Sequence, residues 1–377
     1  MSNAPVKWIV CGLGNISNEW LRVFRMSEDA VPVAFVDPDE AAWAKLKDWG
    51  LGDALSEGKV FHQLEDAYKT VESDGTLILT PPQYHARYLI EAIENLQHVI
   101  TEKPFCTETN ELRHIMSKYR EIAKPNNLIC VVNQQYRFME RIEAIKTALN
   151  SGRIGNPGFV VSHFNEPDYH FNLWWRQQHQ DISFANWFIH HIDTMRYILG
   201  GTPEGAAIPK TVYANLFHLP YSKIIGESSL FLQVEFENGV MWSYDASQEA
   251  RGKGSPGQSE FTIHCSNGTI ENPREGNPMM YIGGTMAGDA VPEPIADKDF
   301  EDIGFKYPPS WDHTMALTVE SIRAGKPNPR LTTFDDNLFS IGIMFCARES
   351  ARTGRKINFK KYIGQFVPEE YLTPKTE

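Results

Sequence analysis

The first 135 residues alternate between short apolar runs and amphipathic stretches, and this alternation constrains the fold more than any other feature of the chain. Runs that are rich in β-branched residues and apolar throughout are typical of strands buried on both faces of a parallel sheet. Alternating strands and helices predict an α/β fold, a doubly wound parallel sheet of the Rossmann type. The predicted strands are Val6–Cys11, Val31–Val36, Thr76–Thr80, His98–Thr101 and Leu128–Asn133, and the predicted helices are Glu19–Met26, Glu40–Trp49, Leu64–Val71, Tyr84–Glu94 and Glu108–Ala123.

The pattern changes after residue 135. Several strand-like segments between Val212 and Ile270 follow one another without helices between them, and Glu237-Asn238-Gly239 and Ser266-Asn267-Gly268 are typical of hairpin turns. We therefore expect an α+β domain with a largely antiparallel, open sheet. The Gly- and Pro-rich segment Asn272–Asp302 is interpreted as a long surface excursion. The predicted domains are residues 1–135 and 136–377.

Composition excludes several classes of protein. The 377 residues include 36 basic and 48 acidic side chains, a net charge of −12, which argues against binding to nucleic acid or to an anionic membrane. Apolar stretches such as Ile182–His191 are too short to span a bilayer, which takes about 20 residues. The N-terminus does not resemble a signal peptide, and five scattered cysteines suggest reduced thiols, so a cytoplasmic location is expected. Because no cluster has metal-ligand spacing, no metal is predicted.

A glycine-rich turn follows the first predicted strand. Gly12, Leu13, Gly14, Asn15 and Ile16 lead into Ser17, which gives the pattern G-x-G-x-x-S. In dinucleotide-binding domains the first glycine allows a tight turn, and the second lets the backbone approach a pyrophosphate. The small third residue allows the helix to pack closely on the strand.

An acidic residue ends the second predicted strand. Asp37 lies 23 residues after Gly14, where a carboxylate binds a ribose 2′-hydroxyl and repels a 2′-phosphate. The alternative is that Asp37 only caps the helix that begins near Pro38. Strand, glycines and acid in this order favour dinucleotide binding, and NAD over NADP.

In such sheets the ligand lies at the carboxyl ends of the strands that flank the topological switch point. Besides the glycine-rich turn, this rule selects Thr80-Pro81-Pro82 and Glu102-Lys103-Pro104. The second tripeptide places two charged residues directly after a buried strand. By itself it is also compatible with a surface lysine before a helix-starting proline.

Taken together, these motifs resemble the Gfo/Idh/MocA family of oxidoreductases, and the matching stretches span nearly the whole chain. They are the Gly12 turn, Thr80–His85, His98–Pro104, Tyr136–Phe138, Ser151–Gly155, Trp175-Arg176, His190–Asp193 and Ser350–Gly354. The resemblance implies NAD(P)-dependent redox chemistry on a sugar, a sugar derivative or a cyclitol. It also implies a homo-oligomer, a dimer or tetramer, formed through the C-terminal sheet.

The resemblance further implies roles for individual residues. Lys103 corresponds to the lysine that reaches the nicotinamide and the reacting hydroxyl, and His190, first in H-x-x-D, corresponds to the catalytic acid/base. Asn186 takes the place of the aspartate that usually precedes this histidine by four residues. Thr80, Pro81, Pro82, His85 and Glu102 are expected beside the cofactor, and His163, Asn165, Tyr136, Trp175 and Arg176 beside the substrate.

Asn186 is a departure from the family pattern. Four residues apart on a helix, Asn186 and His190 would share a face. An asparagine can orient an imidazole, but it cannot stabilise imidazolium by charge, so the histidine would be a weaker base. The alternative is a site in which the proton passes through Lys103 or another acid.

An aromatic and basic segment precedes this helix. It contains Tyr169, His170, Phe171, Trp174, Trp175, Arg176 and His179. Such a segment is compatible with ordinary core and equally with the wall of a sugar site, in which Arg176 would bind an anionic substituent.

Three functions therefore remain open. The first is an NAD-dependent dehydrogenase or reductase of a sugar or cyclitol. The second is a glycoside hydrolase that oxidises a ring hydroxyl transiently and reduces it again, with no net NADH. The third is a non-catalytic sensor, against which Lys103 and His190 argue.

Overall fold

The computed structural model describes residues 4–167, 184–202, 205–255, 257–284, 289–296 and 310–372. Among these residues, no helix combines the length and the apolar character needed to cross a membrane. The chain divides into two compact units, Met1–Gln135 with Pro309–Asn337, and Tyr136–Pro308 with Leu338–Glu377.

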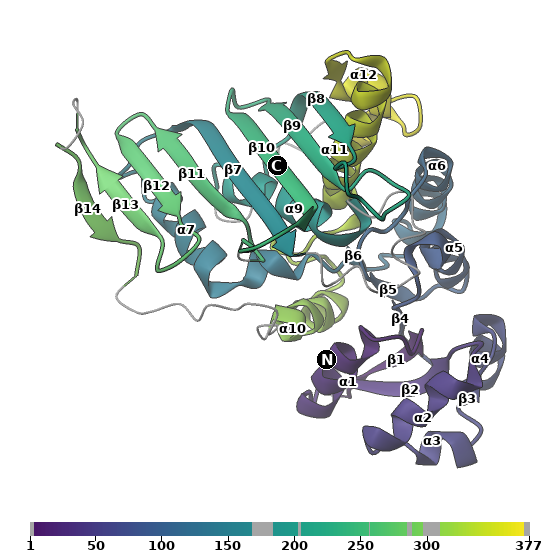
Figure 1. Ribbon diagram of the computed structural model, residues 1–377. Coiled ribbons are helices and arrows are strands. Elements are labelled where there is room, and N and C mark those ends of the chain that lie inside the picture. The colour runs from purple at the N-terminus through teal and green to yellow at the C-terminus, as the bar shows by residue number, and fades with distance from the viewer. Residues whose placement is uncertain are drawn as a thin grey trace. The chain divides into compact units, whose positions relative to one another are not determined.

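The first unit contains a six-stranded sheet in the order β3-β2-β1-β4-β5-β6, and every neighbouring pair is parallel (Figure 1). The doubly wound parallel fold predicted from the sequence is confirmed. Its strands are β1 Val6–Cys11, β2 Ala30–Val36, β3 Val60–Phe61, β4 Gly75–Ile78, β5 His98–Thr101 and β6 Cys130–Val132. Its helices are α1 Ser17–Met26, α2 Glu40–Asp48, α3 Asp53–Ser56, α4 Leu64–Thr70, α5 His85–Glu94 and α6 Thr109–Lys118, with short helical segments η1 Pro82–Tyr84 and η2 Tyr119–Ala123.

The order of the strands reverses between β1 and β4. From β1 the chain moves outward through β2 to β3, and it then returns to β4 on the other side of β1. The loops after β1 and β4 therefore begin at the same edge of the sheet and diverge there. This is the switch point where doubly wound sheets bind ligands.

Residues 310–337 belong to the first unit, whereas the sequence pattern alone assigns everything after residue 135 to one domain. Trp311, the second residue of helix α10, Ser310–Ala324, is fully buried. Arg22 of α1 forms an ion pair with Asp312 at 3.1 Å, and Thr333 forms a β-bridge with Val131. These long-range contacts, which no local pattern reveals, join the segment to the core of this unit.

The second unit contains a nine-stranded sheet in the order β14-β13-β12-β11-β7-β10-β9-β8-β15. Among its described strands, only β7 and β10 pair in parallel, so the expected largely antiparallel sheet is confirmed. The strands are β7 Pro157–Pro167, β8 Pro209–Phe217, β9 Ser229–Phe236, β10 Met241–Ala250, β11 Glu260–Cys265, β12 Gly268–Asn272, β13 Met279–Ile282, β14 Val291–Pro294 and β15 Ile357–Asn358. The helices are α7 Glu140–Asn150, α9 Ile189–Ile198, α11 Phe334–Thr353 and α12 Phe359–Ile363, with η3 Gln135–Phe138, η5 Phe184–Phe188 and η6 Glu369–Tyr371.

The sequence predicts that the segment Asn272–Asp302 is a long surface excursion. Its described part instead contains β13 and β14, which extend the sheet beyond β12. The Gly and Pro residues that suggested a loop occur mostly between these strands rather than inside β13. These residues lie in the turns that join the strands, and the sequence alone does not distinguish such turns from a longer loop.

The two faces of this sheet differ. Leu232, Val234, Trp242 and Tyr244 are buried on one face, where α9 packs. The alternate residues form the other face, and Phe231 is 57% exposed there. Because side chains alternate along a strand, each position on β7, β9 and β10 can be assigned to one of these faces from the strand register.

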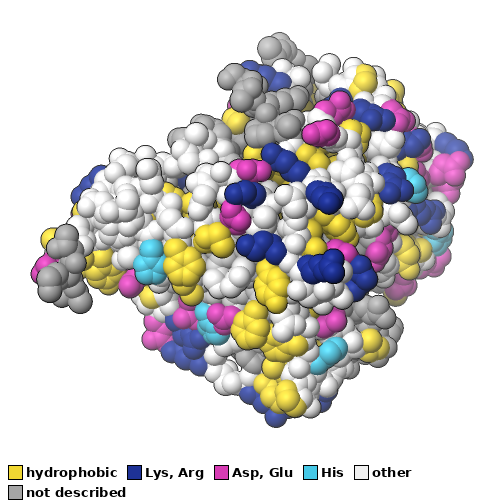
Figure 2. All heavy atoms as spheres, turned by 90° about the horizontal axis from the view of Figure 1, so that it is seen from above, with side chains coloured by type: hydrophobic (Ala, Val, Ile, Leu, Met, Phe, Trp, Pro, Cys, Tyr) yellow, Lys and Arg dark blue, Asp and Glu magenta, His cyan; other side chains and the backbone are white. Residues whose placement is uncertain are grey.

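Figure 2 shows one face of the molecule, on which Lys and Arg side chains lie close to acidic ones and among hydrophobic ones. All five cysteines are unpaired.

Candidate active site

The turn after β1 has room for a ligand at one glycine and none at the other. Gly12 has a φ of 104°, and a Cβ there would lie 2.8 Å from the backbone carbon of Leu79. A Cβ on Gly14 would meet no protein atom within 4 Å. Packing therefore requires the first glycine, whereas the second leaves the backbone open to an approaching molecule.

The amide groups of this turn fit an anion. Ser17 is fully buried and donates from its hydroxyl to the carbonyl oxygen of Gly14 at 2.7 Å. In the described part of the chain, the backbone N–H groups of Gly14, Asn15 and Ile16 donate to no protein acceptor. They precede α1, whose N-terminus carries a partial positive charge. A pyrophosphate would fit here and satisfy these donors.

Asp37 is fixed by two backbone amides. Its Oδ2 accepts from Leu13 N at 2.7 Å, and its Oδ1 accepts from Asp39 N at 2.9 Å. The N-cap of α2 is Asp39, whose carboxylate accepts from Ala41 N. The alternative that Asp37 only caps the helix therefore does not describe this structure. An ionised carboxylate has about four acceptor sites, so two remain for ribose hydroxyls.

His85 connects the two other loops that the sequence selects. The side chain is fully buried, with Nε2 at 2.7 Å from the carbonyl oxygen of Thr80 and Nδ1 at 2.6 Å from that of Pro104. Burial lowers the pKa of His85. The loop Thr80-Pro81-Pro82 and the loop at Lys103 are thus held together by one imidazole. Both of its nitrogens face protein backbone.

Glu102 fixes the start of the loop that carries Lys103. It is 6% exposed, and its Oε1 accepts from Trp20 Nε1 at 2.9 Å, Asn133 Nδ2 at 2.9 Å and Trp311 Nε1 at 3.2 Å. These contacts fix the residue directly before Lys103. Lys103 itself is partly exposed, and its peptide bond to Pro104 is cis.

In the second unit, His190 and its neighbour have different surroundings. His190 is 4% exposed and stacks on Tyr136, with ring centroids 4.4 Å apart and an interplanar angle of 9°. The ring nitrogens of His191 lie against the hydroxyl of Tyr244 and, at 2.7 Å, the carbonyl oxygen of Gly257. These contacts give His191 a structural role.

A buried ion pair orients the helix that carries His190. Asp193 accepts two hydrogen bonds from Arg137, at 2.6 and 2.7 Å, and a third from the hydroxyl of Ser340 at 2.7 Å. Arg137 and Asp193 are both 1% exposed. Sequence reasoning did not assign Arg137 a role. The sequence feature that could have pointed to Arg137 is the aspartate of H-x-x-D, because a buried carboxylate needs a cationic partner.

Asn186 lies in η5, which is a π-helix rather than an α-helix. Its Nδ2 donates to Oε1 of Gln248 at 3.0 Å, and Gln248 is fully buried. A π-turn contains an extra residue and often occurs at functional sites. The expectation that Asn186 and His190 share a face by α-helical spacing therefore does not apply to this segment.

His163 and Asn165 lie on the other face of the sheet. On β7 they are in register with Asp245 and Ser247 of β10, and Asp245 is in register with Phe231 on the exposed face. The Nδ1 of His163 is paired with Asp245, and Asn165 Nδ2 lies 2.7 Å from His163 Nε2. The structure does not bring these residues together with His190, because α9 packs against Phe164, between them on the strand.

Two predicted substrate residues, Trp175 and Arg176, lie outside the described residues, as do the other members of their aromatic segment. Within the described ranges, no group of three or more His, Cys, Asp or Glu residues could hold a metal ion.

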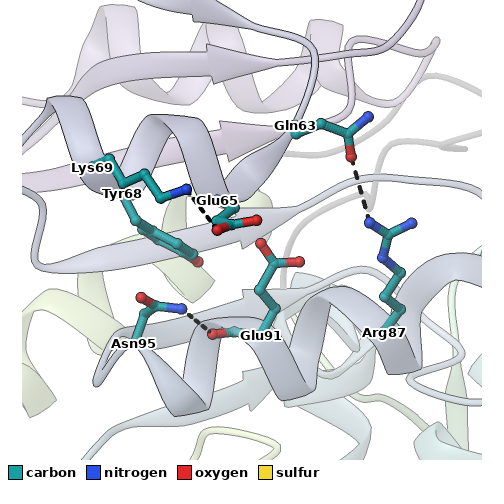
Figure 3. Close-up of a pocket in the computed structure, with 7 residues that line it drawn as sticks. All are labelled: Gln63, Glu65, Tyr68, Lys69, Arg87, Glu91 and Asn95. Atoms are coloured by element: carbon teal, nitrogen blue, oxygen red, sulfur yellow. Dashed lines mark hydrogen bonds and ion pairs between the residues drawn. The ribbon is translucent and has the colours of Figure 1, made fainter.

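A pocket of about 460 Å³ lies between α4 and α5 (Figure 3). It is lined by Gln63, Glu65, Tyr68, Lys69, Arg87, Glu91 and Asn95. None of these residues belongs to the predicted site. Lys69 forms an ion pair with Glu65, and Arg87 donates to Gln63 at 3.4 Å. Both basic side chains that line the pocket therefore have protein partners.

The first unit is thus a nucleotide-binding Rossmann domain, and the second is a sheet domain with a buried histidine on a helix. Residues 6–133 match the model of the oxidoreductase family with an NAD-binding Rossmann fold, and residues 142–271 match the GFO/IDH/MocA C-terminal domain. The chain belongs to the GFO/IDH/MocA family of NAD-binding oxidoreductases.

Individual relatives are distant. An uncharacterized oxidoreductase of Streptococcus pneumoniae is 22% identical over 62% of this chain and 60% of its own length. D-apiose dehydrogenase of Paraburkholderia graminis is 22% identical over 94% of this chain and 90% of its own. A crystal structure of an oxidoreductase from Agrobacterium radiobacter, in complex with NAD⁺, L-tartaric acid and magnesium, superposes with a TM-score of 0.78. It is 18% identical and covers 95% of this chain and 99% of its own, which shows the fold.

Proposed function

We propose that the protein transfers a hydride between NAD and a secondary hydroxyl of a sugar, a sugar derivative or a cyclitol. The observation that carries the proposal is the switch-point edge of the first unit. There the amides of Gly14, Asn15 and Ile16, which have no acceptor among the described residues, follow β1, and the carboxylate of Asp37 and the lysine loop follow β2 and β5. NAD supplies the hydride acceptor or donor. The chain supplies its binding site and the groups that move the proton.

We assign the proton to Lys103 and His190. His190 stacks on Tyr136 and lies three residues before Asp193, which Arg137 holds, so its ring has a defined position for proton transfer. An imidazole titrates near neutral pH, as a general base requires. Lys103 would donate to the developing oxyanion. Glu102 and His85 would hold the loop that presents it.

The substrate class is supported by the relatives. One is a dehydrogenase of the sugar D-apiose, and another was crystallised with L-tartaric acid, a compound with two secondary hydroxyls. We do not include His163 and Asn165 in the substrate site, because they lie on the opposite face of the sheet from α9.

A panel assay tests the proposal. Purified protein with NAD⁺ is mixed with sugars, cyclitols, sugar acids and chromogenic glycosides, and NADH formation and aglycone release are followed in parallel. Accumulation of NADH on a free sugar or cyclitol supports the proposal. Absence of NAD-dependent turnover on every compound, with NAD binding retained, contradicts it and favours a sensor.

Replacing Lys103 gives the first mutational prediction. Lys103→Met should lower kcat by about 10²–10⁴-fold, the usual contribution of a positioned acid–base group. NAD affinity should change little, since the glycine-rich turn and Asp37 are intact. Lys47→Met, on the exposed side of α2, is the control. Full activity of the Lys103 variant would show that another group handles the proton.

Asn186 favours one alternative, the hydrolase with transient oxidation. Its amide is bound to Gln248, and no carboxylate stands at this position. A site with a weaker base is compatible with a ketone that is formed and reduced again without release. Aglycone release that requires NAD⁺ but leaves no NADH would establish this alternative.

We also propose that copies of the chain associate through the exposed face of the nine-stranded sheet. Phe159, Val161, Tyr213 and Phe231 on this face are 39–57% exposed. These side chains lie on β7, β8 and β9 of one sheet face, and several large apolar side chains exposed on one face are typical of an interaction surface.

A further inference from the structure

Lys45 of α2 makes contacts that neither the sequence motif nor the proposed function uses. Its Nζ lies 2.7 Å from the carbonyl oxygen of Leu13, 2.5 Å from that of Gly14 and 3.3 Å from the hydroxyl of Ser17. An ammonium group has three donors, and here all three have an acceptor. Each acceptor belongs to the glycine-rich turn or to the first residue of α1.

These contacts fix the direction of the free amides. In a trans peptide the carbonyl oxygen and the next N–H point in opposite directions. When Lys45 holds the carbonyls of Leu13 and Gly14, the N–H groups of Gly14 and Asn15 must point away from α2. Those are two of the amides without a protein acceptor in the described part of the chain.

The surroundings of Lys45 are consistent with a fixed cation. Partial burial lowers the pKa of Lys45, and the nearby carboxylate of Asp37 opposes this effect. Asp37 accepts from Leu13 N and Lys45 donates to Leu13 O, so both backbone polar groups of Leu13 are held by side chains. By contrast, Lys47, two residues further on the same helix, is exposed.

We propose that Lys45 is a positioning residue for NAD, which holds the glycine-rich turn in the conformation that presents its amides to the pyrophosphate. It acts through the backbone of Leu13 and Gly14 and stabilises this conformation before the cofactor binds. Preorganised donors bind more tightly because less ordering is needed at the moment of binding.

The test combines titration calorimetry and hydrogen exchange on the full chain. In Lys45→Met, the affinity for NAD and for ADP-ribose should fall equally, by about tenfold, which corresponds to the net contribution of one typical hydrogen bond. ADP-ribose lacks the nicotinamide, so an equal loss places the effect at the adenosine diphosphate end. Without any ligand, amides of residues 13–17 should exchange faster than in the wild type, and kcat at saturating NAD should be nearly unchanged.

Lys47→Met is the matched control and should behave as the wild type. Ser17→Ala, which removes one acceptor of Lys45 and one donor to Gly14, should shift both readouts in the same direction by less. Unchanged exchange with weaker binding would overturn the proposal and indicate a direct contact with phosphate. Faster exchange throughout the first unit would also overturn it, in favour of a general structural role.

The inference rests on NAD binding within the proposed function, not on the identity of the substrate. The wild-type titration separates the two possible failures. If the wild type does not bind NAD, the proposed function fails. If it binds NAD and the Lys45 variant binds equally well, only the role of Lys45 fails.

Discussion

Single side chains with several protein partners hold the loops of the candidate site. Glu102 accepts from two tryptophans and an asparagine, and His85 lies between the carbonyl oxygens of two loops. Both were expected beside the cofactor. Their contacts give them a supporting role, in which they position Thr80 and Lys103. Groups held in this way lose little entropy when a ligand binds.

A histidine of the first sheet gives a prediction at the residue scale. His98 begins β5, and its Nδ1 accepts from Ile129 N at 2.9 Å, which requires an unprotonated nitrogen. Burial lowers the pKa of His98, as it does for His85. The unfolded chain therefore binds more protons than the folded one below about pH 6.5, and the stability should fall as the pH decreases through that value.

The check is the thermal midpoint of the wild type and of His98→Asn between pH 7.5 and 5.5. The amide oxygen of asparagine can accept the same hydrogen bond but does not titrate. The variant should lose less stability than the wild type over this range. Equal losses would mean that His98 is not among the groups that set the pH dependence.

At the scale of elements, two side chains of η3 fix the position of α9. Tyr136 stacks on His190, and the next residue, Arg137, binds Asp193 three residues after His190. Two consecutive side chains of η3 thus contact two positions about one turn apart on α9. This arrangement fixes both the rotation and the position of the helix that carries the proposed acid/base.

Breaking the ion pair between Arg137 and Asp193 tests this arrangement. Arg137→Met would leave Asp193 buried without its main partner, and the loss of stability should be about 3–5 kcal/mol. The control is Arg153→Met, which removes an exposed pair with Glu293 and should leave the thermal midpoint unchanged. Because Arg196, whose Nη1 lies 3.8 Å from Asp193 Oδ1, compensates the buried carboxylate only in part, Arg137→Met combined with Asp193→Leu should recover part of the lost stability. A midpoint for Arg137→Met close to that of the control would contradict this account.

At the scale of the whole molecule, the chain contributes to the first unit twice. After the second unit has begun, residues 310–337 return and add Trp311 and Phe334 to the core of the first. The exposed face of the nine-stranded sheet is the other feature at this scale. It carries aromatic side chains beside the pair of His163 and Asp245.

Association through this face predicts a change in mass. Phe231→Lys together with Phe159→Lys should shift the protein to a smaller species in light scattering after gel filtration, because two buried cations would oppose each contact. Met26→Lys replaces an exposed apolar residue of the first unit and should leave the mass unchanged. An unaltered oligomer in the double variant would exclude this face as the interface.

The sequence alone determined the parallel sheet, the antiparallel second sheet and the cofactor motif. These follow from local periods, since a strand buried on both faces is apolar throughout and a glycine turn is contiguous in the chain. Only the tertiary structure decided which face of the sheet carries His163 and Asn165, which residue fills the position of the N-cap near Asp37, and that Lys45 reaches the glycine-rich turn. It also decided that Trp311 binds Glu102, 209 residues earlier. Such contacts depend on strand register and on the packing of distant segments, and neither of these can be read from the periodicity of the sequence.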